Sequence, residues 1–415
     1  MMRKLLSLSL MALATSSVFA GGYRVSLQGQ KQLAMGHTGV AVVNSAESLF
    51  FNPAGISFLE NKFNVSVGGN ALFANVKFQN ETYNWNAESK NVGTPFSVYA
   101  TYKVTDWLSV GLAVYTPYGS AVDWDQDWQG SHLVNNIDLE AIYVQPTIAI
   151  KINDKMSIAG GPIFVTGHVK LNKNIDRSMS DENGNRTDVS IEAKGVTAWG
   201  WNAGLMFNPT DHLRIGFNYR SEITMEARGG DATFNDVPAY AQGTLTNTTF
   251  DANLPLPAEI TVGLSYEFTN KLLVAFDYNR TQWGVYKDLT VQFHNAVGTS
   301  VNPRNYKDSN AYRFGAQYKA TDKVVVRGGY YIDESPVQAG YFAPETPRND
   351  SRGYTAGMTY QFNKRFGVDL SLLYLHFKQT NSSYDHFVEG GNEVSFGGTY
   401  KSAVFSPGVG ITYGF

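Results

Sequence analysis

The chain has no cysteine among its 415 residues, and it is poor in charge. Without cysteine, no disulfide framework can hold the fold together. Charged residues make up 17% of the chain, whereas about 25% is usual in soluble proteins. The formal net charge of −3 lacks the basic excess of nucleic-acid-binding proteins, so no nucleic-acid partner is expected. Beyond the N-terminal region no uninterrupted apolar run is present, which excludes a transmembrane helix.

The first 20 residues have the pattern of a secretory signal peptide. Arg3 and Lys4 precede an apolar stretch, and Val18 and Ala20 stand where a signal peptidase needs small residues. The apolar stretch is shorter than the roughly 20 residues that a helix needs to cross a bilayer, which argues against a membrane anchor. We therefore predict cleavage after Ala20 and an exported mature chain that begins at Gly21.

The rest of the chain is rich in aromatic residues (13%) and in glycine (40 residues). Apolar residues alternate with polar or small ones, for example over residues 213–220, 272–279 and 366–374. Such alternation predicts β-strands with one apolar and one polar face. A soluble sandwich would bury the apolar face, whereas a membrane barrel turns it toward lipid and lines its lumen with the polar face. Arg214 and Arg220, on the polar face, fit a water-filled lumen.

Short polar turns and long polar loops separate these strands. The six turns are 104–106, 153–155, 208–211, 269–271, 320–323 and 363–365. The seven loops fall near 78–94, 119–137, 172–188, 226–250, 288–310, 333–351 and 378–398. Short turns on one side and long loops on the other are typical of outer-membrane barrels. We therefore predict an all-β fold, a 14-stranded antiparallel transmembrane barrel in the outer membrane of a Gram-negative bacterium, because an even number of strands closes the sheet without an edge.

The two ends of the mature chain carry further signals. Residues 409–415 alternate apolar residues with glycine and threonine and end on an aromatic residue, Phe415. This pattern resembles the terminal-strand signal that the barrel assembly machinery reads, so we expect that machinery as a partner during biogenesis. Residues 21–62 precede the first strand and contain an aromatic cluster that requires burial. The lumen is the available interior, so we predict a small N-terminal hatch at 21–62 and the barrel at 63–415.

Part of the predicted hatch resembles a known family. Asn52, Pro53 and Ala54 resemble the NPA signature of the FadL-type outer-membrane long-chain fatty acid transporters. Further segments similar to the family follow in the same order, at 199–204, 219–222, 253–255, 283, 311–313 and 333–337. The resemblance implies a 14-stranded barrel with a hatch, passive uptake of hydrophobic molecules, and contact with outer-membrane lipids. Family members take up either fatty acids or aromatic hydrocarbons, and both classes remain open here.

The resemblance also implies residues that contact substrate. Lys173 aligns with a basic residue of the family's pocket after the fifth strand, and Arg304 aligns with a second one. A gap placed before Ala311 would move the second role to Lys307. Tyr23 aligns with an aromatic residue near the mature N-terminus that reaches the pocket, where the family has phenylalanine. A carboxylate head group needs such cations, although solvated loop cations are the alternative interpretation.

A lateral exit is the last feature that the resemblance implies. In the family, an inward kink of the third strand opens a gap in the barrel wall. Here that strand covers 108–115 and is followed by Thr116, Pro117, Tyr118 and Gly119. Proline lacks a ladder donor and glycine permits a bend, so both favour broken strand pairing. The alternative is that the strand ends at this point and a loop begins.

Other chemistry has little support in the sequence. The seven histidines show no close metal-ligand spacing, and no phosphate-binding motif is present. A lipase would need a Ser–His pair facing lipid, but Ser371 and His376 are an odd number of residues apart and lie on opposite faces of a strand. We therefore expect no enzyme, no metal and no cofactor, and a monomer. A general diffusion porin is the alternative from another class; its lumen would be open and lined with charge.

Overall fold

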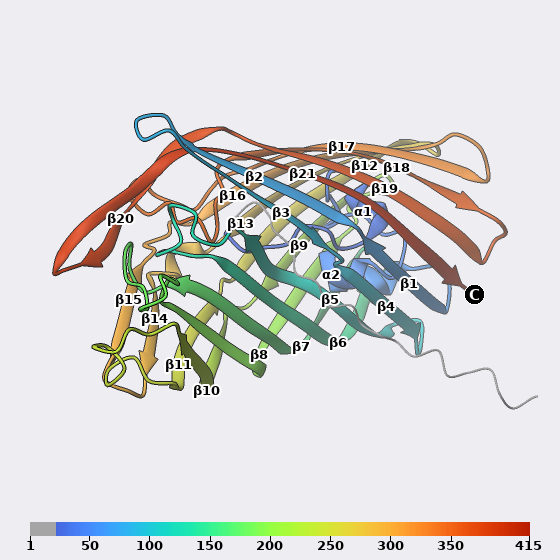
Figure 1. The fold of residues 1–415 in the computed structure, drawn as a ribbon. Helices are drawn as coiled ribbons and strands as arrows, with labels where there is room; N and C mark the ends of the chain where they lie inside the picture. Colours follow the sequence, from blue (N-terminus) through green and yellow to red (C-terminus); the bar gives the residue numbers. More distant parts are fainter. Residues whose placement is uncertain (1–21) are drawn as a thin grey trace, which may run out of the picture.

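The computed structural model of the chain describes residues 22–415 (Figure 1). The predicted signal peptide and its cleavage site lie outside the described residues. The strands form one antiparallel sheet that closes on itself, because the first strand pairs with the last from Asn64–Gly414 to Asn70–Gly408. No helix in the described part of the chain is long and apolar enough to span a membrane.

The sheet contains 21 strand segments. They are β1 (Phe63–Asn70), β2 (Leu72–Asn80), β3 (Trp85–Gly93), β4 (Phe96–Lys103), β5 (Leu108–Asp123), β6 (Asn136–Asn153), β7 (Met156–Asn174), β8 (Asp188–Phe207), β9 (Leu213–Arg220), β10 (Ile223–Asn235), β11 (Thr248–Leu256), β12 (Glu259–Thr269), β13 (Leu272–Thr281), β14 (Asp288–Phe293), β15 (Thr299–Pro303), β16 (Ser309–Lys319), β17 (Val324–Asp333), β18 (Ser351–Gln361), β19 (Phe366–Phe377), β20 (Thr380–Glu389) and β21 (Asn392–Gly414). Several consecutive segments, such as β1 and β2 or β9 and β10, continue one another along a single barrel strand. The sheet is thus a closed 14-strand antiparallel barrel, which confirms the predicted fold class.

The six predicted short turns each join two neighbouring strands, from β4–β5 to β18–β19. The expected loops at 78–94, 288–310 and 378–398 are wrong as loops, because most of their residues form paired strands. In the first, β2 and β3 stay paired up to Asn80–Trp85; in the last, β20 and β21 stay paired up to Glu389–Asn392. These segments contain many polar residues, although β14 still alternates Leu289, Val291 and Phe293 with polar residues. Each hairpin also buries part of one face, with Phe78, Val291 and Phe396 at most 5% exposed.

The two faces of the barrel wall differ as the alternation predicts. On β19, Leu370 and Leu372 are 47% and 40% exposed on the outer surface, while Asp369 and Ser371 are 1% and 6% exposed on the inner one. Arg220 is likewise buried on the inner face. An apolar outer surface and a polar inner surface suit a barrel surrounded by lipid.

The N-terminal segment lies inside the ring of strands (Figure 1, dark blue). It contains two short helices, α1 (Gln30–Leu33) and α2 (Ser48–Phe51), and the 3₁₀ helix η1 (Pro53–Phe58); a second 3₁₀ helix, η2 (Trp283–Val285), follows β13. The η1 helix contacts β5 to β8, whereas α1 contacts β18, β19 and β21. Since these strands come from different sides of the barrel, the segment spans the cross-section of the lumen.

Candidate functional site, an apolar cavity in the barrel lumen

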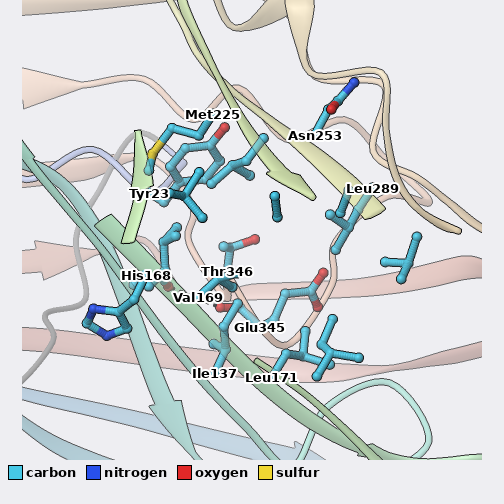
Figure 2. A pocket seen from close by; sticks show the side chains of 18 of the residues that line it. Tyr23, Ile137, His168, Val169, Leu171, Met225, Asn253, Leu289, Glu345 and Thr346 are labelled. Atoms are coloured by element: carbon cyan, nitrogen blue, oxygen red, sulfur yellow. Dashed lines mark hydrogen bonds between the residues drawn. The ribbon is translucent and has the colours of Figure 1, made fainter. Parts of the chain in front are cut away.

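A cavity with mostly apolar walls lies within the barrel (Figure 2). Its wall comes mostly from β6, β7, β8, β10, β11 and β14. Alternate residues of these strands point inward, so pairs such as Ile137 and Leu139 or Val169 and Leu171 line the same space. Apolar walls of this kind suit an apolar ligand.

Tyr23 lines this cavity at the start of the N-terminal segment. Its ring packs edge-on against Trp283 and Tyr286, with ring centroids 4.8 and 5.6 Å apart. Its hydroxyl donates a hydrogen bond to the Pro255 carbonyl. Burial raises the pKa of the Tyr23 hydroxyl well above its usual value, so the group stays neutral. The residue therefore offers an aromatic face to the cavity and has its polar end satisfied elsewhere.

Glu345 and Thr346 also line the cavity, and the sequence did not single out either of them. They belong to the loop 334–350 between β17 and β18. Figure 2 shows both at the same cavity as Ile137 and Leu171. An isolated acidic residue in a polar loop gives no signal in the sequence, because only the fold brings that loop into the lumen.

Arg304 does not line the cavity directly but forms an ion pair with Glu345, and both side chains are buried. Its guanidinium also donates to the Tyr384 hydroxyl over 3.1 Å and lies over the Tyr384 ring, 5.1 Å from the centroid. Burial lowers the pKa of this guanidinium, but Glu345 and the neighbouring tyrosines together outweigh burial and the pKa lies above its usual value. Arg304 is therefore a charged group that is separated from the cavity by Glu345, its ion-pair partner in the cavity wall.

Lys173 lies on β7, two residues beyond Leu171 and therefore on the same face of the strand. Its ammonium lies 5.8 Å from the centre of the Phe387 ring. Within the described residues, no carboxylate comes within ion-pair distance of this ammonium. Lys173 is close enough to Arg304 and Glu345 for their charges to act on it. The structure thus brings together the two predicted cations and one carboxylate; Lys307, the alternative to Arg304, is an exposed residue of the 304–308 connection.

Asn52, Pro53 and Ala54 lie at the beginning of η1, away from the cavity. The Asn52 side chain accepts from the Ala54 amide over 3.1 Å and donates to the carbonyls of Val40 and Leu205, both over 2.9 Å. Because Leu205 belongs to β8, this motif ties the N-terminal segment both to itself and to the barrel wall.

A charged network lies next to the cavity, centred on Glu259, a residue that the sequence did not indicate. Its carboxylate pairs with Arg24 of the N-terminal segment and Arg220 of β9, each at 3.3 Å. The Tyr118 hydroxyl donates to the same carboxylate over 3.2 Å, and Arg24 also pairs with Asp333 at 2.8 Å. These charged side chains are buried, and their pairing with one another offsets the cost of removing them from water.

The wall of the barrel is interrupted beside this network. Pairing between β4 and β5 ends at Ser97–Tyr115, although β5 continues to Asp123 and stays paired with β6. The expected end of this strand at Tyr115 is therefore correct only for its pairing with β4. On the side that faces β6 the strand continues, so no loop begins there. A bulge separates Tyr115 from Tyr118. The freed backbone groups of Pro117 and Gly119 bond the N-terminal segment instead: the Val25 amide donates to Pro117 over 2.7 Å, and Gly119 donates to Tyr23 over 2.8 Å.

Comparison with known proteins identifies a family and several relatives for this chain. Residues 11–415 match the family model described as outer membrane protein transport protein (OMPP1/FadL/TodX). An outer-membrane protein of Neisseria meningitidis serogroup B is 26% identical, over 97% of each chain. The long-chain fatty acid transport protein of Escherichia coli K12 is 23% identical, over 66% of this chain and 68% of its own length.

Solved structures show the same fold. A FadL homologue of Pseudomonas aeruginosa is 18% identical and superposes with a TM-score of 0.83, covering 95% of this chain and all of that one (100%). The toluene transporter TodX of Pseudomonas putida is 17% identical, with a TM-score of 0.73 and coverage of 96% and 99%. The chain therefore belongs to the OMPP1/FadL/TodX family of outer-membrane transport proteins, the β-barrel transporters of hydrophobic compounds.

Proposed function

We propose that this protein takes up long-chain fatty acids by passive diffusion, binding each molecule in the apolar cavity. The observation that carries the proposal is the position of Lys173, a cation without a carboxylate partner among the described residues, on the same strand face as the cavity-lining Leu171. Lys173, Arg304 and Glu345 together hold two positive charges and one negative charge. The group can therefore accept one more carboxylate, and an acyl chain attached to that carboxylate would extend along apolar walls.

Aromatic hydrocarbons are the second candidate class, on the same fold. The family includes a protein called a toluene transporter, and the Tyr23 side of the cavity here is aromatic. A neutral aromatic molecule would use the same walls but would gain nothing from Lys173. A general diffusion porin fits less well, because the N-terminal segment occupies the lumen.

The route that we propose ends sideways. Residues 21–62 would act as a hatch that blocks direct passage to the periplasm once residues 1–20 have been removed. The interruption at Pro117, Tyr118 and Gly119 would let an apolar molecule pass into the bilayer. Leaving through water would instead cost about 0.8 kcal/mol for each CH₂ exposed. The hatch supports this exit, because it satisfies backbone groups that would otherwise be unpaired in lipid.

The test compares a fatty acid with the alcohol of the same chain length, using the protein in lipid nanodiscs. Lys173→Ala should weaken binding of the acid by about tenfold or more, since a hydrogen bond to a charged group contributes roughly 1.5–3 kcal/mol. Binding of the alcohol should change little. Lys170→Ala, on the exposed face of the same strand, is the matched control and should change neither affinity.

Two outcomes would count against this proposal. Equal losses for acid and alcohol would remove the head-group role of Lys173 and leave only an apolar cavity, which favours the hydrocarbon alternative. If the unmodified protein bound neither molecule, the assignment of this substrate class would fail altogether.

A further inference from the structure

Glu345 is a carboxylate in a place where a transporter of apolar molecules has no need of one. Its residue is 4% exposed, and it lines the cavity beside Leu171 and Leu289. Its one ion-pair partner among the described residues is Arg304. A buried carboxylate without a partner is costly, so the pair with Arg304 keeps Glu345 in this position.

Arg304 has other anchors and does not need Glu345 to stay in place. One of its guanidinium nitrogens donates to the Pro303 carbonyl over 3.0 Å and to the Tyr384 hydroxyl over 3.1 Å. The guanidinium also lies over the Tyr384 ring. The nitrogen that meets Glu345 is the other one. A second carboxylate could therefore replace Glu345 on Arg304 while the guanidinium remains where it is.

The loop that carries Glu345 also touches the interrupted part of the barrel wall. The Ser120 hydroxyl of β5 donates to the Glu345 carbonyl over 3.3 Å. The Trp124 indole, just after β5, donates to the Pro344 carbonyl over 3.2 Å. Arg348 donates to the Gly22 carbonyl at the start of the N-terminal segment. One loop thus connects the head-group region, the end of β5 and the hatch.

We propose that Glu345 occupies, in the protein without ligand, the position on Arg304 that the substrate carboxylate takes. A bound anionic lipophile then replaces Glu345 on Arg304. This inference rests on the proposed function and concerns how the same site selects and responds to its ligand. The exchange swaps one carboxylate for another, so Arg304 is never left unpaired. The displaced Glu345 moves toward the ammonium of Lys173, which has no carboxylate partner among the described residues, and loop 334–350 moves with it. An anionic ligand thereby loosens the contacts of Ser120 and Trp124 beside the proposed exit, whereas a neutral ligand leaves them intact.

The first experiment removes the competitor. Glu345→Gln, which keeps the size of the side chain, should tighten binding of a long-chain fatty acid by about tenfold in nanodiscs and leave binding of the matching alcohol unchanged. Glu345→Ala should act in the same direction. Glu389→Gln is the control, because it also breaks a carboxylate–arginine pair, with Arg177, but at a more exposed position outside the cavity. Its fatty acid affinity should stay at the wild-type value.

The outcomes separate this inference from the proposed function. If the unmodified protein binds the acid but both Glu345 variants bind it equally well or more weakly, the proposed role of Glu345 is wrong and the substrate assignment survives. If the unmodified protein binds neither acid nor alcohol, the proposed function itself fails.

The second experiment detects movement of the loop. Saturating fatty acid should change the tryptophan fluorescence of the protein, and the alcohol should not. The change should disappear in Trp124→Phe, whose ring cannot donate to Pro344. A signal of equal size from acid and alcohol, or one that persists in Trp124→Phe, would overturn the coupling between Glu345 and the β5 contacts.

Discussion

The inner face of one barrel carries two adjacent regions of opposite character. The cavity is lined mostly by apolar side chains, whereas the network around Glu259 holds paired charges. The two regions meet at consecutive residues of the N-terminal segment: Tyr23 lines the cavity, and Arg24 belongs to the network. The same alternation of residues can therefore serve two purposes: an apolar inner face can hold an apolar ligand, and a charged inner face can hold the N-terminal segment against the wall.

The largest effect should come from breaking the charged region. Glu259→Ala would leave Arg24 and Arg220 buried without this carboxylate, and loss of one partner in a buried pair costs about 3–5 kcal/mol. Urea unfolding in detergent micelles should show the loss in the free energy of unfolding. Glu267→Ala is the control, because its pair with Arg214 is partly exposed and should contribute about 1 kcal/mol or less. Equal losses for the two variants would mean that the network does not hold the N-terminal segment in place.

The next test acts at the boundary between the two regions. Tyr118 contacts Glu259 of the charged network, and Ser120 lines the apolar cavity. Pro117 and Gly119 therefore lie at the boundary, where an apolar molecule would leave the cavity beside the network. Replacing both Pro117 and Gly119 with valine should favour a straight, paired strand. Uptake of fatty acid by cells with normal protein levels should fall, while binding to the purified protein stays the same. Unchanged uptake would rule out this exit.

The smallest effect should come from Tyr23→Phe, which leaves the aromatic side of the cavity in place. The variant loses one hydrogen bond, to Pro255, which is typically worth about 1 kcal/mol. Fatty acid and alcohol affinities should both change by less than about tenfold and by equal factors. A selective loss for the acid, measured in the same binding assay, would show that the hydroxyl contacts the head group and that the apolar region is less uniform than its lining indicates.

Much of the fold could be predicted because its signals are local. Alternation along residues 366–374 predicts one outward and one inward face, and the polar turn at 363–365 predicts where the chain reverses. Three hairpins were mistaken for loops for the same reason. Their alternating runs are short and lie among many polar residues, and only pairing with a neighbouring strand reveals them.

The site depended on less local information. The family resemblance pointed to Tyr23, Lys173 and Arg304, and the structure places Tyr23 in the cavity wall and the two cations near Glu345. Nothing along the chain could show that Glu345 reaches Arg304, because the loop that carries it enters the lumen only after the barrel has closed. The same holds for Glu259, whose partner Arg24 lies 235 residues away.

The sequence by itself determined the closed barrel, its turns and its apolar outer surface, because these follow from a two-residue period that lipid enforces along every strand. Proline and glycine also marked where the third strand would break, since both weaken strand pairing regardless of context. Only the tertiary structure decided which strand loses its partner there and which carboxylate meets each buried cation. Those choices depend on the N-terminal segment lying inside the lumen, where burial makes every unpaired charge or backbone group costly and so selects partners from distant parts of the chain.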